Sequence, residues 1–308
     1  MRRRFLYQSF LVFSAVIIVS SCFFFIICKG LRETSRDNSG KFNYLIKDTT
    51  HYNTLFVGAS SVHSGINPFL FDSLTGLHSF NAGMDGISIT EMSLVVNKFI
   101  KSHGSPENVF INLDEVTLAP KEGIWSFPQY YPYVYDPDFD VLLTHEPKLL
   151  LGKYFPAFAV TYFDDPLKNL GLIGWFEIKN KIKGFSFTRG YEPFPPIKNL
   201  DAGLIENNLF FEANKDGWAI LEKTLLDCQK IKVHVFLTNT PKFSSDYSAS
   251  SASYFTQLNA VANHYNATVI LHSTDTTFST TMFRDKNHIN CDGANLFTTL
   301  LTQQFSIK

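Results

Sequence analysis

The sequence has few cysteines, little charge and no excess of either sign. It contains four cysteines in 308 residues, and only Cys228 and Cys291 lie outside an N-terminal apolar run. Two distant cysteines are too few for a disulfide scaffold; they could pair, although buried free thiols are the commoner state. A formal net charge of −1 excludes nucleic-acid binding through bulk charge. No CxxC pair and no metal-ligand spacing occurs, so the sequence implies neither a metal nor an organic cofactor.

What the sequence does contain is one long apolar run at its start. Phe5–Cys28 carries no charged residue, and its 24 residues can span a bilayer. Arg2–Arg4 precedes the run, so the positive-inside rule keeps the N-terminus in the cytoplasm and sends the remaining chain outside. A cleaved signal peptide is the alternative, but its apolar region is usually about 7–15 residues long. We therefore expect a transmembrane anchor at 5–28 and a single-pass protein with an extracytoplasmic domain.

The remaining chain divides by composition. Residues 29–52 are polar, and we expect a linker or stalk there. Residues 53–308 form the main domain, interrupted at about 120–210 by a stretch rich in aromatic residues and proline. We interpret this stretch as an insertion, partly helical, that lies over the sheet. Its aromatic cluster at Trp125–Tyr135 could stack on sugar rings or could form a covering core layer.

The main domain alternates between predicted strands and predicted helices. The strands are predicted at 55–57, 79–81, 108–113, 231–241 and 267–272. The helices are predicted at 68–75, 88–104, 215–230, 254–266 and 293–305. The first helix starts at Asn67-Pro68 and ends at Gly76, and the second opens with a capping box of Ser88 and Glu91. This alternation predicts an α/β fold, a three-layer α/β/α sandwich with a parallel sheet.

Two serines follow the first predicted strand, in "NTLFVGASSVHSGINP" (53–68). In a parallel sheet, active sites lie at the carboxyl ends of the strands, where Ser60 and Ser61 fall. A nucleophilic serine needs a base within hydrogen-bond reach, and the base needs an orienting carboxylate. Asp285 precedes His288 by three residues in a loop between the last strand and the last helix. Gly, Ala and Ser also make ordinary turns, so each pattern alone is weak.

Three segments taken together resemble the SGNH (GDSL-like) hydrolase superfamily: "FVGASSVHSGINP", "FNAGMDGIS" and "DKNHINCDGANLF". They look most like its membrane-anchored bacterial branch, which includes proteins involved in O-acylation of envelope polysaccharides. The resemblance covers about 55–115 and 230–305 and does not extend to the aromatic insertion. It implies an SGNH-hydrolase-like, flavodoxin-like sheet in addition to the N-terminal transmembrane helix.

The resemblance also implies a role for each matching residue. Ser60, rather than Ser61, occupies the position of the family nucleophile. Asp285 and His288 match the acid and the base. The backbone N–H groups of Ser60 and Gly86 match the donors of the oxyanion hole, which would stabilise the negative charge on the attacked carbonyl oxygen.

One position departs from the family pattern. Family members place an Asn after the third strand as a further oxyanion donor, whereas residues 114–116 of this sequence are Asp-Glu-Val. A carboxylate aimed at a developing oxyanion would repel it, and losing one such donor costs about 10²–10³ in rate. Asn112, Asn81 and Asn239 are candidate substitutes that the sequence does not rank. Asp114 and Glu115 could equally form a capped or solvated turn.

The resemblance predicts a membrane-tethered serine esterase or O-acyltransferase that acts on acyl groups of an envelope or exported glycan, through an acyl-serine intermediate. Its partners would be an acylated glycan or acyl donor and a membrane-bound acyltransferase. The alternative is a catalytically weak or inactive SGNH-like domain that binds polysaccharide or scaffolds a membrane acyltransferase complex. The missing Asn favours this alternative, and the joint presence of Ser60, Asp285 and His288 favours the enzyme. Arg189 could bind an anionic substrate or form a surface ion pair.

Overall fold

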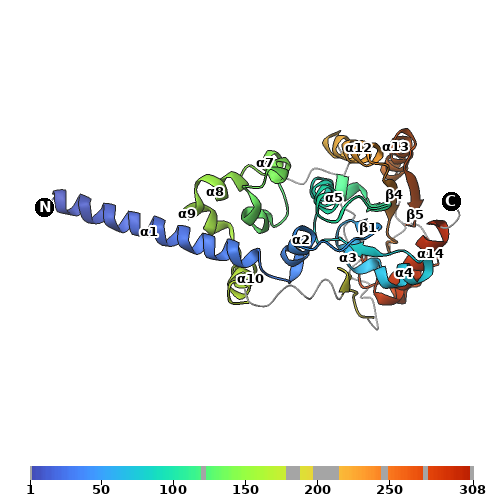
Figure 1. The fold of residues 1–308 in the computed structure, drawn as a ribbon, viewed down its shortest axis with the longest axis horizontal. Coiled ribbons are helices and arrows are strands. Elements are labelled where there is room, and N and C mark those ends of the chain that lie inside the picture. Colours follow the sequence, from blue (N-terminus) through green and yellow to red (C-terminus); the bar gives the residue numbers. More distant parts are fainter. Residues whose placement is uncertain are drawn as a thin grey trace. The chain divides into compact units, whose positions relative to one another are not determined.

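A computed structural model describes residues 2–118, 123–177, 188–196, 215–243, 249–272 and 277–305 (Figure 1). The chain divides into two compact units. The anchor unit comprises Met1–Tyr44 and Gly123–Gly184, and the sheet unit comprises Leu45–Glu122 and Phe185–Lys308. Each unit is therefore assembled from segments that are far apart in the sequence.

The sheet unit contains five strands, all in parallel pairs, in the order β2-β1-β3-β4-β5. The strands are β1 (Thr54–Val57), β2 (Ser79–Asn81), β3 (Asn108–Asn112), β4 (His234–Asn239) and β5 (Thr268–Leu271). The helices are α3 (Ser60–Gly65), α4 (Pro68–Thr75), α5 (Ile89–His103), α6 (Glu115–Leu118), α12 (Lys215–Lys230), α13 (Ala249–His264), the 3₁₀ helix η5 (Thr280–Met282) and α14 (Cys291–Phe305). The predicted α/β fold with a parallel sheet is confirmed.

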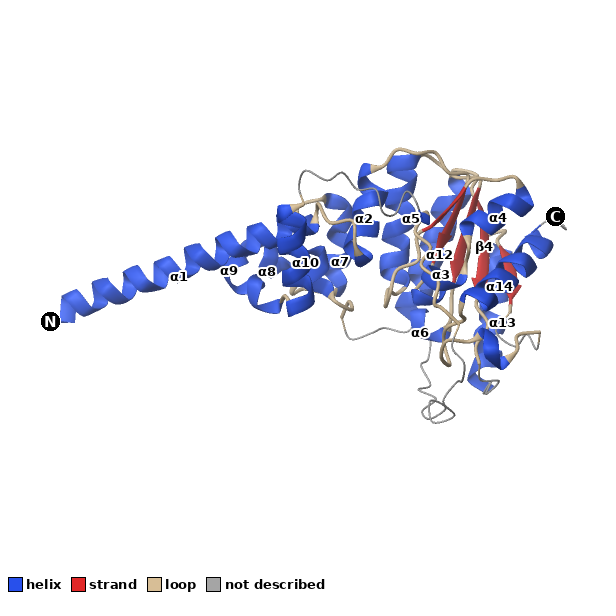
Figure 2. Cartoon of the chain, turned by 90° about the horizontal axis from the view of Figure 1, so that it is seen from below, coloured by secondary structure: helices blue, strands red, loops and turns tan. Residues whose placement is uncertain are grey.

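Helices cover both faces of this sheet (Figure 2). On one face α14 packs against α3 and α4, and on the other α5 packs against α12. The strand register places Phe56, Phe110 and Phe236 side by side on β1, β3 and β4. Their rings lie 5.0 and 4.5 Å apart between centroids, and all three are buried. This row of phenylalanines is the apolar centre that fixes the register of the three middle strands.

Local sequence signals set both ends of α4 and the start of α5 as predicted. Asn67 caps α4, with Oδ1 accepting from the N–H groups of Phe69 and Leu70, and Gly76 ends it in the left-handed conformation. Ser88 and Glu91 form the predicted capping box at the start of α5. These caps satisfy backbone groups that a helix leaves unpaired at its ends.

The anchor unit is almost entirely helical. Its elements are α1 (Arg2–Leu31), η1 (Phe127–Tyr133), η2 (Pro137–Phe139), α7 (Asp140–His145), α8 (Leu149–Tyr154), α9 (Pro156–Ala159), η3 (Val160–Tyr162) and α10 (Asp165–Phe176), while α2 (Asp37–Lys47) runs from this unit into the sheet unit. The rings of Phe24, Tyr131 and Phe163 meet at its centre, with centroids 5.4 to 5.7 Å apart.

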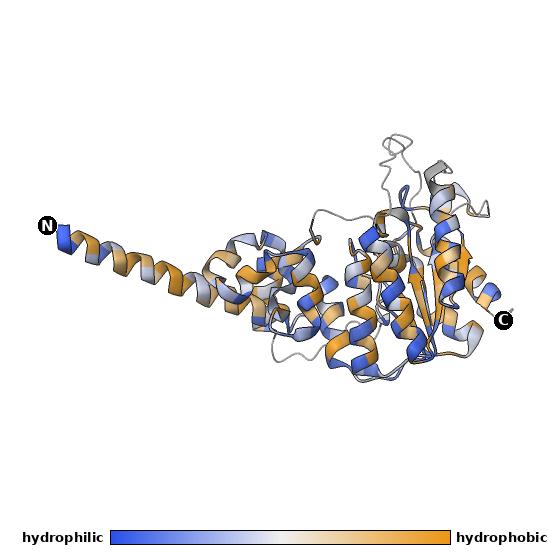
Figure 3. Cartoon of the chain, turned by 90° about the horizontal axis from the view of Figure 1, so that it is seen from above, coloured by the Kyte–Doolittle hydropathy of each residue, from blue (hydrophilic) through white to orange (hydrophobic). Residues whose placement is uncertain are grey.

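The helix α1 is apolar along most of its length (Figure 3). Within the described residues it is the one helix long and apolar enough to cross a membrane, which fits a single-pass anchor or a signal sequence. It extends beyond the predicted span of 5–28, and its last turns are covered by protein. Ile27 and Leu31, for example, are fully buried.

Residues 29–52 differ from the predicted linker. They contain the end of α1 and all of α2, and Phe42 and Leu45 are buried. The segment is polar in composition, but the folded chain provides partners for its buried polar groups. Asn43, for example, is buried and donates from Nδ2 to the carbonyl oxygens of Leu31 and Thr34 at 2.7 and 2.9 Å.

The predicted insertion at about 120–210 is also divided differently. Residues 123–177 are largely helical and belong to the anchor unit, whereas residues 188–196 belong to the sheet unit. The part at 197–210 lies outside the described residues, and the expected position over the sheet stays a prediction. In the cluster Trp125–Tyr135, Tyr130, Tyr131 and Tyr133 are buried, and the two end residues are exposed. The core-layer interpretation holds for the middle of the cluster.

Candidate active site

Ser60 is the first residue of α3 and lies just beyond the carboxyl end of β1. This is where the chain order reverses in the sheet, because β1 connects first to β2 on one side and β3 then pairs on the other. Ligands bind parallel sheets at such switch points. Ser60 Oγ lies 2.7 Å from His288 Nε2, so the predicted contact between the serine and the histidine is present.

His288 lies in the loop between η5 and α14, and Asp285 holds its ring. His288 Nδ1 is 2.8 Å from Oδ1 and 3.0 Å from Oδ2 of Asp285. An ionised carboxylate only accepts hydrogen bonds, so Nδ1 carries the proton and Nε2 is free to accept from Ser60 Oγ. The three side chains therefore form a connected serine–histidine–aspartate chain in the order that general-base catalysis requires.

The local sequence "DKNHIN" shapes the loop that carries this pair. Asp285 Oδ1 also accepts from the backbone N–H groups of Asn287 and His288 at 2.9 and 3.0 Å, which closes a tight turn. Asn290 Oδ1 accepts from the N–H groups of Asp292 and Gly293 at the start of α14. The spacing of Asp, His and Asn thus follows from a turn that leads directly into a capped helix.

The same contacts determine the ionisation of Asp285. Burial alone would raise the pKa of this carboxyl group, but several interactions with the charged form outweigh it. These are hydrogen bonds from the His288 ring and from the backbone N–H groups of Asn287 and His288, together with the charge of His288. The pKa of Asp285 is therefore lowered from its ordinary value of 3.8, and the group is a carboxylate at neutral pH.

Ser61 has a different partner, in agreement with the prediction that Ser60, rather than Ser61, is the nucleophile. Its Oγ donates to Oδ1 of Asn112, at the end of β3, over 3.2 Å. Within the described contacts it makes none with His288. Asn112 itself is buried, and its Nδ2 has no hydrogen-bond partner among the described residues.

The loop after β2 carries Gly86, the predicted oxyanion donor. Gly86 has a φ of 71°, a conformation that glycine adopts readily. The loop is held against β1 because the Met84 N–H donates to the Gly58 carbonyl oxygen over 3.0 Å. The loop therefore lies beside the strand that leads into Ser60. The role of the Ser60 and Gly86 N–H groups toward an oxyanion stays a prediction.

The departure from the family pattern at Asp114 has a structural explanation. Asp114 Oδ1 accepts from the backbone N–H of Thr117 over 2.9 Å, and Oδ2 forms an ion pair of 3.1 Å with Lys242. The carboxylate is thus a helix cap with a neutralising partner, which is the capped turn that was the alternative interpretation.

The candidate substitutes for the missing Asn now separate. Asn81 donates from Nδ2 to the carbonyl oxygens of Val62 and Ile66 at 2.7 and 2.8 Å, so it is a structural residue. Asn239 Oδ1 accepts from the backbone N–H of His272 over 2.7 Å. Asn112 is the candidate whose buried Nδ2 has no hydrogen-bond partner among the described residues.

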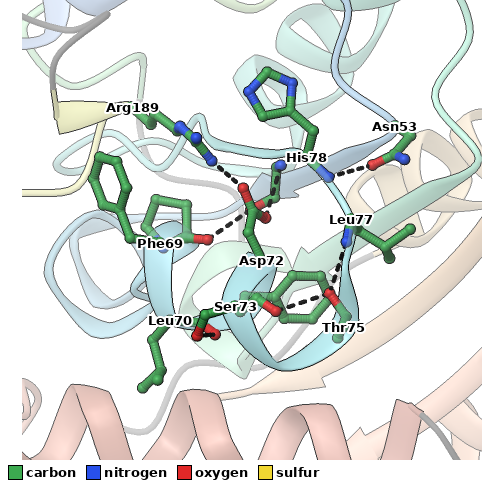
Figure 4. Close-up of polar contacts among 12 residues, drawn as sticks. Asn53, Phe69, Leu70, Asp72, Ser73, Thr75, Leu77, His78 and Arg189 are labelled. Atoms are coloured by element: carbon green, nitrogen blue, oxygen red, sulfur yellow. Dashed lines mark hydrogen bonds and ion pairs between the residues drawn. The ribbon is translucent and has the colours of Figure 1, made fainter.

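Sequence reasoning missed the part played by residues 188–196, which we call the site segment. Its Phe194 ring packs edge-on against the His288 ring, with centroids 5.5 Å apart, and its backbone carbonyl oxygen accepts from the N–H of Cys291 over 2.8 Å. At its other end, Arg189 forms an ion pair with Asp72 (Figure 4). Arg189 is therefore an ion-pair residue, as the second interpretation proposed.

His63 was also missed, although it is three residues after Ser60 on α3. Its Nδ1 is 3.0 Å from Asp85 Oδ1, and its Nε2 is 3.5 Å from Glu192 Oε2. It thereby links the Gly86 loop to the site segment. The motif "SSVHSG" gave no sign of this, because Asp85 and Glu192 reach His63 only through the fold.

The cysteines and the metal-binding candidates can also be placed. All four cysteines are free, so Cys228 and Cys291 do not pair. In the described parts of the chain, no group of three or more His, Cys, Asp or Glu side chains is arranged to hold a metal ion.

No protein-family model matches this chain, and no curated protein matches it. Solved structures do align with it. One is an inferred acylhydrolase from Bacteroides fragilis, with 11% identity, 89% of this chain and 96% of that chain covered, and a TM-score of 0.45. A second is a GDSL-like lipase from Bacteroides thetaiotaomicron, with 9% identity, 82% of this chain and 87% of that chain covered, and a TM-score of 0.40. A third is a mutant acetylxylan esterase from Geobacillus stearothermophilus, with 10% identity, 84% of this chain and 95% of that chain covered, and a TM-score of 0.42. The structural neighbours are thus GDSL-type hydrolases and esterases.

Proposed function

We propose that this chain is a membrane-tethered serine esterase or O-acyltransferase acting on acyl groups of an envelope or exported glycan. The observation that carries the proposal is the 2.7 Å contact between Ser60 Oγ and His288 Nε2, with Asp285 holding Nδ1 of the same ring. This arrangement activates a hydroxyl for attack on an ester carbonyl. The tether is supported by the length and composition of α1, and the glycan by the resemblance of the sequence motifs.

The reaction has two halves. In the first, Ser60 Oγ attacks the acyl carbonyl carbon while His288 Nε2 takes the hydroxyl proton, and Asp285 stabilises the imidazolium that forms. The oxyanion would be held by the N–H groups of Ser60 and Gly86. The intermediate then collapses, His288 returns the proton to the leaving alcohol, and the acyl group stays on Ser60 as an ester.

In the second half, an acceptor hydroxyl attacks acyl-Ser60 and gives its proton to His288, which passes it to Ser60 Oγ as that atom leaves the acyl carbon. Water as acceptor yields a carboxylic acid, and a sugar hydroxyl yields a new ester. The structure contains the same side chains for both outcomes, and esterase and transferase differ only in this acceptor.

A serine-directed fluorophosphonate probe tests the proposal. The full-length protein in detergent or nanodiscs should be labelled, and labelling should vanish in Ser60→Ala. Ser61→Ala is the matched control, because Ser61 donates to Asn112 and not to His288, and it should keep its labelling. If labelling persists in Ser60→Ala and disappears in Ser61→Ala, Ser61 is the nucleophile and the proposed assignment is wrong.

The second candidate is a non-catalytic SGNH-like domain that binds polysaccharide or scaffolds a membrane acyltransferase complex. The observation that favours it is the capped, ion-paired Asp114 at the position where the family has an oxyanion donor. Absence of any labelling of the folded wild-type protein would support this candidate and reject the enzyme.

A further inference from the structure

The anchor unit exposes a band of aromatic side chains that its own core does not use. Tyr154, Phe155 and Phe158 are 58 to 63% exposed, and Tyr162 is 42% exposed. They lie on α8, α9 and η3, in the segment "YFPAFAVTYF" (154–163), which contains no charged residue. A monomeric water-soluble surface rarely gathers so many large apolar side chains in one short segment.

This aromatic segment (154–163) lies against the helix proposed as the membrane anchor. Both α9 and η3 pack against α1, and Figure 1 shows α9 beside α1. Phe163 contacts Phe24, with ring centroids 5.7 Å apart. The contact is fixed by α10, the next helix. A Cβ atom built on Gly171 would lie 2.7 Å from Ile27 Cγ2, so the backbones of α1 and α10 approach each other closely.

The position of this contact along α1 indicates that the exposed aromatic side chains face lipid. From Phe5 to Phe25, α1 exposes apolar side chains, and at 1.5 Å per residue this stretch is about 30 Å long, the thickness of the hydrocarbon core. Burial of α1 by protein begins at Phe24, which is 2% exposed, whereas Phe25 on the other side is 51% exposed. The aromatic segment therefore flanks α1 where its membrane-spanning stretch ends.

The charges around the aromatic segment suit the same level. Lys153 precedes it, with Nζ 6.0 and 5.9 Å from the ring centroids of Tyr135 and Tyr154. Lys29 on α1 lies 5.0 Å from the Trp175 ring. Aromatic rings with basic side chains beside them are typical of the membrane–water interface, where rings lie at the headgroup level and ammonium groups reach the phosphates. Asp164 and Asp165, which follow the segment, are used to cap α10 and to pair with Lys168.

We infer that the aromatic segment 154–163 inserts into the membrane–water interface on the extracytoplasmic side, beside α1. The anchor unit would then be held on the lipid surface by two elements, α1 and this segment. The inference rests on the proposed membrane tether. The occupant of the exposed aromatic face is the headgroup and upper acyl region of the bilayer. The insertion would stop the anchor unit from tilting freely about a single helix, because α1 and the segment are packed together.

Depth-dependent quenching tests the inference in single-copy nanodiscs. The full chain, with Cys22→Ser and Cys291→Ser, receives one reporter cysteine labelled with an NBD fluorophore, and the lipids carry doxyl quenchers near the headgroup or deep in the acyl chain. The reporters are Phe158→Cys in the aromatic segment, Val12→Cys in α1, and Leu226→Cys in α12 as the matched exposed control; Leu226 is 39% exposed.

The expected result is that Phe158→Cys loses most of its emission with the shallow quencher and Val12→Cys with the deep one, while Leu226→Cys keeps its emission. Quenching at Val12 with none at Phe158 would overturn the inference and keep the tether. No quenching at Val12 would overturn the tether itself. Equal quenching at Leu226 would show adsorption of the whole chain and also overturn the inference.

The other occupants of this face are outcomes of the same experiment. A blue-shifted but unquenched label at Phe158 would mean that protein covers the segment, and the inference would fail. Because each nanodisc holds one copy, a second copy cannot provide that cover.

Discussion

Replacing Asp285 by Asn is a sharp test of the proposed chemistry, because it changes one proton-accepting atom. Asp285 Oδ1 accepts from two backbone N–H groups, at 2.9 and 3.0 Å. In Asp285→Asn the amide oxygen would keep these bonds, since the NH₂ group cannot accept them. The amide oxygen would stay 2.8 Å from His288 Nδ1, but the NH₂ group would take the place of Oδ2, 3.0 Å from the same nitrogen.

A neutral amide no longer stabilises the imidazolium by its charge, and its NH₂ group opposes a protonated Nδ1, which favours the tautomer with the proton on Nε2. That nitrogen lies 2.7 Å from Ser60 Oγ and could no longer accept its proton. Loss of the tautomer in such a triad lowers turnover by about 10⁴, which corresponds to about 5.4 kcal/mol at 1.36 kcal/mol per decade. The turn hydrogen bonds survive, so we expect the free energy of unfolding to change by less than about 1 kcal/mol.

The assay is the rate of hydrolysis of p-nitrophenyl acetate by the full chain, together with urea unfolding of the same samples. Asp292→Asn is the matched control, because Asp292 is a carboxylate near the site that no described contact joins to His288; it should keep the wild-type rate. A wild-type rate for Asp285→Asn would refute the triad. A large loss of stability would show instead that Asp285 mainly supports the loop.

Three further predictions concern ionisation and strain. Folding lowers the pKa of Asp285 below 3.8, so its carboxylate adds stability at neutral pH that is lost as the pH falls through the lowered pKa. The free energies of urea unfolding of wild type and Asp285→Asn should therefore converge in acid, and a difference that grows there would contradict this. Gly190→Ala should lower the free energy of unfolding by about 1–3 kcal/mol, because φ is 78° and the new Cβ would lie 1.9 Å from the Asn81 carbonyl oxygen. Gly76→Ala, at a φ of 74° with no atom within 4 Å of the new Cβ, should lower it less, and equal losses in urea unfolding would reject the clash. Burial, with the charge of Asp227 adding, raises the pKa of Cys228 to about 12, so iodoacetamide should modify it only after denaturation, and rapid modification of the folded chain, mapped by mass spectrometry, would disagree.

Several features of this protein are determined by the sequence within a few residues. The caps at Asn67 and Ser88 and the glycine at Gly76 fix helix ends through bonds to neighbouring backbone groups, and each was predicted from three or four letters. The α/β fold follows from the alternation of apolar segments and helical spacing. Asp285 and His288 belong to this class too, because the turn that joins them is local.

Other features depend on partners that are far away in the sequence. The segment 29–52 resembles a linker by composition, but tertiary contacts bury Phe42 and Leu45, and the distant Tyr133 hydroxyl donates to Oδ1 of Asn43 between them. The aromatic insertion gave no sign that residues 188–196 would separate from it and pack on the active site. The residues near Asp114 in the sequence do not predict its ion pair with Lys242, which follows β4.

The candidate site shows both kinds of determination in one place. The sequence by itself placed Ser60 after a strand and His288 after a turn, and the family resemblance ranked Ser60 above Ser61. Only the tertiary structure decided that Ser60 Oγ faces His288 while Ser61 turns to Asn112, and that Phe194 packs against the histidine ring. The physical reason is that caps and turns satisfy backbone groups close to their own position, whereas a site at the edge of a sheet is built from loops that meet only when the strands pair.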